Sequence, residues 1–101
     1  MNIYSAVEFN PREPSVVLIE KTGTLKMFCV ALCKDQLLQK HQAHVPSFLV
    51  VVKGSVDFLV GAEVVTLQEL DTYRIPLKTD HEVKGRLDQN IILITQELNP
   101  V

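Results

Sequence analysis

The chain has 101 residues, which suits a single domain, 1–101, with one small core. Hydrophobic residues make up 47% of it and charged residues 22%, a globular composition that excludes the disordered and fibrous classes. The net charge is −2 and no long basic run is present, so we expect neither nucleic acid nor a membrane surface as a partner.

The chain reads as a series of short strands. Pro11 and Pro14 predict a loop over Asn10–Ser15, and Gly61-Ala62 a tight hairpin turn. No segment has a sustained helical apolar period, so we predict an all-β fold, an antiparallel sandwich or jelly-roll barrel. Apolar and β-branched runs between turn residues predict strands over Val16–Glu20, Leu25–Cys33, Gln36–His41, Ser47–Lys53, Ser55–Val60, Glu63–Leu67, Thr72–Ile75, Glu82–Lys84 and Asn90–Gln96.

Two details of these runs bear on packing and location. The fully apolar run Phe48–Val52 predicts a strand buried on both faces, and it is too short to span a bilayer. Cys29 and Cys33 would share one strand face about 13 Å apart, too far for a disulfide, so we expect two small buried thiols. The first residues lack a signal-peptide pattern, and we expect a cytoplasmic location.

The segment from His41 to Gly54 resembles the first motif of the cupin family, G-x5-H-x-H-x3-4-E-x6-G. With Gly54 as the anchor, His41 matches the first histidine of the motif. Ala43 then stands at the second histidine, Ser47 at the glutamate and Asp35 at the leading glycine.

The segment from Leu70 to Gly85 resembles the second cupin motif, G-x5-P-x-G-x2-H-x3-N. Pro76 and His81 match, whereas Leu70 and Lys78 replace the two glycines and Gly85 stands at the asparagine. Lys78 lacks the backbone freedom of glycine, so a turn of a different type is expected there. The resemblance covers 36–96 and implies a double-stranded β-helix, the cupin form of the jelly roll.

In metal-binding cupins, the motif histidines and glutamate hold one divalent ion, and such ligands suit iron, manganese, nickel, copper or zinc. Here Ala43 cannot ligate and Ser47 is a poor ligand. His44 is one residue past the second-histidine position, so a regular strand would turn it outward unless a bulge brings it inward. Two alternatives stay open: a metal site on His41, His44 and His81, or former ligands that are hydrogen-bonded in a metal-free pocket.

The resemblance leaves three functions to be weighed. The favoured one is a small-molecule-binding barrel with a degenerate metal site, in which Ser47 and either Tyr73 or Arg74 contact the ligand. By strand alternation, one of Tyr73 and Arg74 faces the interior. The alternatives are a metal-dependent enzyme of dioxygenase or isomerase type, with one divalent ion, and a structural protein with a filled barrel. The resemblance also implies a homodimer, because small cupins commonly pair through a sheet edge or an exchanged N-terminal strand, for which Met1–Phe9 is the candidate.

Overall fold

The computed structural model describes residues 1–98, apart from the side chains of Lys40 and His41. Within this part, no helix reaches the length and hydropathy needed to cross a membrane. The elements are one helical turn and a series of strands: α1 (Ile3–Ala6), β1 (Ser15–Lys21), β2 (Leu25–Cys33), β3 (Leu37–His41), β4 (Ser47–Lys53), β5 (Ser55–Val60), β6 (Glu63–Gln68), β7 (Thr72–Ile75), β8 (His81–Gly85) and β9 (Gln89–Glu97).

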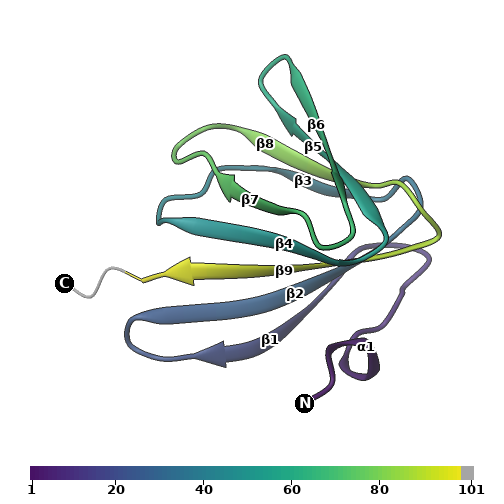
Figure 1. The fold of residues 1–101 in the computed structure, drawn as a ribbon, viewed down its shortest axis with the longest axis horizontal. Helices are drawn as coiled ribbons and strands as arrows, with labels where there is room; N and C mark the ends of the chain where they lie inside the picture. The colour runs from purple at the N-terminus through teal and green to yellow at the C-terminus, as the bar shows by residue number, and fades with distance from the viewer. Residues whose placement is uncertain (99–101) are drawn as a thin grey trace.

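The strands form two antiparallel sheets that face each other as a flattened barrel (Figure 1). The larger sheet has the order β1-β2-β9-β4-β7 and the smaller sheet the order β3-β8-β5-β6. Consecutive strands repeatedly cross from one sheet to the other, as in a double-stranded β-helix. The predicted all-β jelly roll is therefore confirmed.

The predicted strand bounds are close to those observed. The bounds of β2, β4, β5 and β7 agree with the prediction. Those of β3 and β6 differ by one residue at one end, and β1, β8 and β9 are one residue longer at each end. The predicted hairpin turn is also present, because Val60 pairs with Glu63 across Gly61-Ala62. The sequence did not predict α1, a single helical turn. Asn2 caps its start, because Asn2 Oδ1 accepts a hydrogen bond from the Ser5 N–H at 3.0 Å.

The interior between the two sheets is filled by apolar side chains, and we call this cluster the interior core. Its buried members are Val30, Leu32, Ala43, Leu49, Val51, Val56, Phe58, Leu67, Ile75, Val83, Ile92 and Ile94. The prediction that Phe48–Val52 is buried on both faces was wrong, because Phe48 is 40% exposed on the outer face. Burial on both faces belongs to β2 and β9, where Cys29–Leu32 and Asn90–Ile92 are fully buried.

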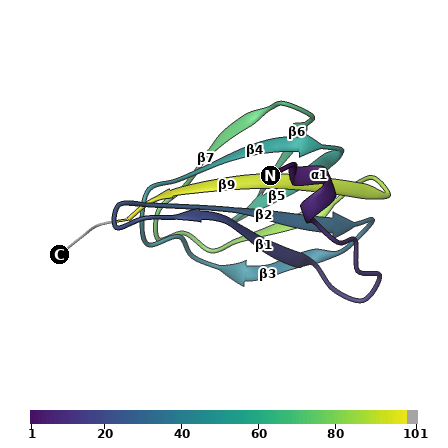
Figure 2. The same cartoon turned by 90° about the horizontal axis from the view of Figure 1, so that it is seen from below.

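A second apolar cluster lies on the outer face of the larger sheet, beneath the N-terminal segment. Cys29, Ala31 and Ile91 point to this face, and Val7 of the N-terminal segment covers them. The segment lies near the end of the barrel where β2 ends (Figure 1, Figure 2). Neither cysteine forms a disulfide, as the strand geometry predicted. Cys29 is buried, which raises the pKa of its thiol, but Cys33 is only half-buried, so the prediction of two buried thiols was wrong for Cys33.

At that end of the barrel, one buried side chain connects three strands. Asn90 is fully buried, and its Oδ1 accepts from the Ser55 N–H at 2.9 Å and the Leu87 N–H at 3.2 Å. Its Nδ2 donates to Leu32 O at 3.0 Å and Leu87 O at 2.8 Å. A Cβ at Gly54 would lie 2.5 Å from Asn90 Oδ1, and one at Gly85 2.8 Å from Nδ2. Gly85, which stands at the asparagine position of the second motif, has no side chain, and the Asn90 amide fills the space that this leaves.

The motif's glycine positions keep a left-handed backbone although three of the four lack glycine. Asp35 has φ 66°, Leu70 φ 68°, Lys78 φ 53° and Gly54 φ 79°. The expectation of a different turn type at Lys78 was therefore wrong. Tertiary hydrogen bonds hold these turns: the Lys78 N–H donates to Ala43 O at 2.8 Å and the Leu70 N–H to Val51 O at 2.7 Å. Asp35, Leu70 and Lys78 therefore adopt left-handed conformations although none of them is glycine, the residue that adopts this conformation without strain.

Replacing Asn90 with Ala should destabilise the fold by about 3 kcal/mol or more, because it leaves buried N–H and C=O groups without partners. Urea denaturation followed by circular dichroism measures the loss. The neighbouring variant Gln89→Ala, at an exposed position, is the control and should cost about 0.5 kcal/mol or less. Equal losses in the two variants would contradict a special role of the Asn90 amide.

Leu70→Gly should stabilise the protein by about 0.5 to 1 kcal/mol, because relief of the left-handed strain exceeds the entropy that glycine loses on folding. Leu70 is 75% exposed, so little packing is lost. Leu77→Gly is the matched control at a position without positive φ, and it should be destabilising. Thermal and urea denaturation of both variants test this, and destabilisation by both would contradict it.

Candidate functional site

Aromatic side chains from the two sheets meet inside the end of the barrel where the loops 42–46 and 76–80 lie, which we call the mouth. These loops are joined by a bridge between Ala43 and Leu77. Phe58 of the smaller sheet is fully buried and contacts Tyr73 of the larger sheet, with ring centroids 4.7 Å apart. Phe58 also stacks on His81, with the ring centroids 4.9 Å apart and an interplanar angle of 23°. One phenylalanine thus brings together two groups from facing sheets.

His81 opens β8 and is 3% exposed. Its Nδ1 lies 3.2 Å from Thr79 O, a contact in which the ring nitrogen donates if it is protonated. In the ladder between β3 and β8, His81 is the direct cross-strand partner of His41. The side chain of His41 lies outside the described residues, so the predicted role of this histidine stays a prediction.

Ser47, the candidate at the glutamate position, begins β4 and is 1% exposed. Its hydroxyl donates to Val45 O at 2.9 Å and accepts from Gln96 Nε2 at 3.2 Å. A serine–glutamine hydrogen bond therefore stands at the position where the resemblance implies a carboxylate. Gln96 is a residue that sequence reasoning missed as part of the site, since only the pairing of β4 with β9 places it opposite Ser47.

Strand alternation in β7 places the two remaining ligand-binding candidates, Tyr73 and Arg74, on opposite faces of the sheet. Tyr73 is half-buried against Phe58, whereas Arg74 is exposed, with its guanidinium carbon 5.0 Å from the Phe48 ring centroid on the outer face. The structure therefore brings Tyr73 toward His81 and leaves Arg74 outside the barrel. Phe58, like Gln96, was missed: its inward position follows from alternation in β5, but nothing in the sequence marks it as a site residue.

The residues at the mouth do not fit the ligand set of a metal-binding cupin. Ala43 is buried at the second-histidine position, and His44 is exposed. His44 instead lines a surface hollow with Thr24, Leu25 and Glu97, so it does not turn inward through a bulge. Among the described side chains, no three His, Cys, Asp or Glu residues lie together in a way that could hold a metal ion.

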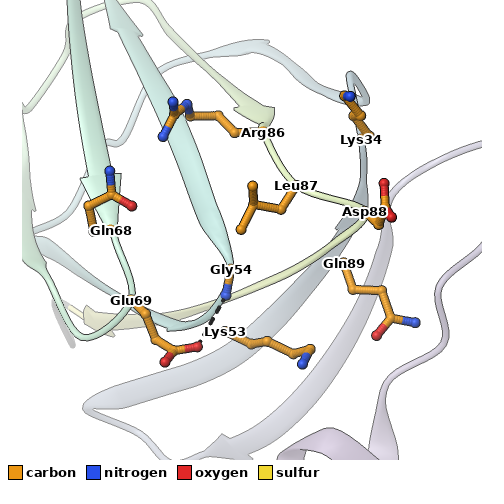
Figure 3. Close-up of a pocket in the computed structure, with 9 residues that line it drawn as sticks. All are labelled: Lys34, Lys53, Gly54, Gln68, Glu69, Arg86, Leu87, Asp88 and Gln89. Carbon is orange, nitrogen blue, oxygen red and sulfur yellow. Dashed lines mark hydrogen bonds between the residues drawn. The ribbon is translucent and has the colours of Figure 1, made fainter.

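A hollow of about 970 Å³ lies at the opposite end of the barrel, beside Gly54 (Figure 3). Its lining mixes charges, since it contains Lys34, Lys53 and Arg86 as well as Glu69 and Asp88. Several of these groups have partners, since Arg86 Nη1 donates to Ser55 Oγ at 2.8 Å and the Gly54 N–H donates to Glu69 Oε1 at 3.4 Å. The hollow is formed largely by exposed side chains, and it lacks the aromatic and buried polar groups found at the mouth.

The environment of Tyr73 keeps its phenol neutral. Burial and then the negative charge of Glu63 raise the pKa of Tyr73 above its ordinary value of 10.0. The neutral phenol is a hydrogen-bond donor as well as an acceptor. Because the folded-state pKa is raised, the stability linked to Tyr73 is complete below about pH 10 and is lost as pH rises through the folded-state value.

A spectrophotometric titration should find Tyr73 ionising at higher pH than a free tyrosine. The chain has two tyrosines, so Tyr4→Phe isolates the signal of Tyr73. Adding Glu63→Gln should lower the pKa of Tyr73 while leaving it above the ordinary value, because burial is the larger cause. The account would be contradicted by a Tyr73 that titrates at or below pH 10.0 in the folded protein.

No protein-family model and no curated protein matches this chain in sequence. Solved structures do match it. A cupin superfamily protein from Desulfitobacterium hafniense superposes with a TM-score of 0.86 at 9% identity, covering 98% of this chain and 90% of that one. An RmlC-like cupin from Desulfovibrio desulfuricans has a TM-score of 0.82 at 20% identity, covering 95% and 93%.

A conserved protein with a double-stranded β-helix domain from Klebsiella pneumoniae has a TM-score of 0.86 at 15% identity, covering 100% of this chain and 91% of that one. At these identities the likeness concerns the fold. The motif resemblance, the two-sheet topology and the superpositions agree, and the chain has the cupin fold.

Proposed function

We propose that this protein binds a small organic molecule at the mouth of its barrel, without the help of a metal ion. The observation that carries the proposal is the contact of Tyr73 and His81, from facing sheets, with the same buried Phe58. Ligand sites are typically apolar and aromatic, with a small number of polar groups that fix orientation. The mouth has this composition, whereas the rest of the interior core is apolar.

The chemistry of these groups suggests the ligand class. The half-buried ring of Tyr73 offers apolar contact, its neutral phenol can donate or accept a hydrogen bond, and the imidazole of His81 can do either. Ser47 and Gln96 already satisfy each other, so a ligand would reach them by replacing that hydrogen bond. A compact molecule with hydroxyl or carboxyl groups and an apolar face, such as a sugar or a small hydroxy acid, suits this arrangement.

A metal-dependent enzyme is the second candidate function, and one observation favours it. The backbone positions of His41 and His81 are paired in the ladder of β3 and β8, so two of the histidines of the resemblance stand on neighbouring strands. Two imidazoles would, however, need further ligands, which Ala43 and Ser47 do not supply. Elemental analysis of the native protein and of the His41→Ala variant tests this candidate. A metal-dependent enzyme requires near-stoichiometric metal in the native protein and loss of that metal in the variant.

Ligand binding can be tested by thermal shift in the presence of a chelator. The probes are monosaccharides, short hydroxy acids and benzoate, and a binder should raise the melting temperature. Tyr73→Phe and His81→Asn should each weaken the response by about tenfold in apparent affinity, since each removes a polar contact worth about 1.4 kcal/mol.

Arg74→Ala is the matched control for this screen, because Arg74 lies beside Tyr73 on the same strand but on the outer face. Its response should equal that of the native chain. The proposal fails if no probe stabilises the native protein, or if Arg74→Ala abolishes a response that Tyr73→Phe and His81→Asn both leave intact.

A further inference from the structure

A row of polar side chains crosses the inner face of the larger sheet at the mouth. Lys26 on β2 pairs with Gln96 on β9, and Gln96 pairs with Ser47 on β4. Cross-strand partners share a face, and Ser47 is buried inside the barrel, so all three residues stand on the inner face. In Figure 1, β2 begins, β9 ends and β4 begins at the same end of the barrel. An ammonium, an amide and a hydroxyl, each a hydrogen-bond donor, therefore follow one another along the row.

The ammonium of Lys26 lies over the inner face and has no acidic partner. Its Nζ is 5.2 Å from the ring centroid of Phe28, which packs against the interior core. On β1, the direct partner of Lys26 is Lys21, and like charges in such a pair are destabilising. No carboxylate of the described side chains forms an ion pair with either lysine. A bound anion would offset the charge of both.

The opposite charge stands on the other side of the mouth. Glu63 on β6 pairs with Val60, and Val60 pairs with His81. Val60 packs against the interior core, so Glu63 stands on the inner face of the smaller sheet. After burial, the charge of Glu63 is the second cause that raises the pKa of Tyr73, which agrees with a position near the phenol. In the larger sheet, Tyr73 is three strands away from Lys26, about 14 Å along the sheet.

We propose that the mouth selects a monocarboxylate, which it holds with the carboxylate beside Lys26 and the hydroxyl or apolar end beside Tyr73. This inference rests on the proposed function and narrows its ligand class. At Lys26 a carboxylate meets a positive charge and can accept a hydrogen bond from the Gln96 amide, and such charge-assisted bonds are strong. At Tyr73 a carboxylate would be repelled by Glu63.

This arrangement discriminates on both sides of the mouth. A neutral sugar lacks the attraction to Lys26, and a dicarboxylate has a second charge that Glu63 repels. Specificity of this kind combines an attractive group with a repulsive one. A hydroxy acid with one carboxylate is therefore favoured over a sugar and over a diacid.

Calorimetric titration with two matched series of probes tests the selection. Sorbitol, gluconate and glucarate share one carbon chain and differ in carrying no carboxylate, one or two. Benzyl alcohol, benzoate and terephthalate do the same on an aromatic ring. In a series that binds, the monocarboxylate should bind about tenfold more tightly than the alcohol and more tightly than the dicarboxylate. Added salt should reduce the preference over the alcohol, because Lys26 is only half-buried.

Variants of the positive side identify the residue responsible. Lys26→Gln should abolish the preference for the monocarboxylate over the alcohol, and Lys26→Arg should keep it. Lys53→Gln is the matched control, because Lys53 Nζ also lies over an aromatic ring, 5.1 Å from the Tyr4 centroid, at the opposite end of the barrel. It removes the same charge and should leave the preference unchanged. Circular dichroism checks that each variant is folded.

A variant of the negative side tests the repulsion. Glu63→Gln should raise the affinity for the dicarboxylate several-fold and leave that for the alcohol unchanged. Glu82→Gln is the matched control, since strand alternation places Glu82 on the outer face of β8. It should change neither affinity.

The outcomes separate this inference from the proposed function. An alcohol or a dicarboxylate that binds the native chain as tightly as the monocarboxylate would overturn the inference and leave the proposed function standing. So would a preference that survives Lys26→Gln, or one that Lys53→Gln reduces equally. If no probe of either series binds, both proposals fail.

Discussion

The amide of Asn90 is the interaction on which the barrel most depends. Its four hydrogen bonds reach the backbone of β2, the start of β5 and the turn before β9, so one side chain fixes how the two sheets meet at this end. Gly54 and Gly85 are required by the same contact, since a Cβ on either would overlap the amide or adjacent backbone. At the mouth, by contrast, the two sheets meet through packed side chains, with Phe58, Ser47 and His81 buried between them.

The turns carry a second constraint, which concerns backbone shape rather than residue type. Leu70 and Lys78 are held in left-handed conformations that glycine would adopt without strain. The Lys78 N–H donates to Ala43 O, so the turn before His81 is tied to the loop before Ser47. Strain of this kind persists only where the surrounding structure determines the conformation. At the mouth, a serine–glutamine pair and an alanine stand at positions where the motif resemblance implies metal ligands.

Most of the fold could be predicted from the sequence, because strand alternation and turn residues are local signals. The strands from Leu25–Cys33 to Thr72–Ile75 follow such signals closely. Features set by distant contacts could not be predicted. Lys78 is left-handed because of a hydrogen bond to Ala43, Asn90 matters because of the space left by two glycines, and α1 is too short to produce a helical period. At the site, alternation indicated that one of Tyr73 and Arg74 faces inward, but only the contact with Phe58 of the facing sheet identified Tyr73. Gln96 could not be predicted because the pairing of β4 with β9 is what sets it opposite Ser47.

We propose that side chains, not backbone, distinguish this mouth from that of a metal-binding cupin. The most direct measurement is zinc and manganese binding by calorimetry to the native chain and to the double variant Ala43→His with Ser47→Glu, both checked for folding. The account predicts about one tightly bound ion per chain in the variant and much weaker binding in the native protein. Equal, near-stoichiometric binding by the native chain would contradict it, as would a folded double variant that binds no metal.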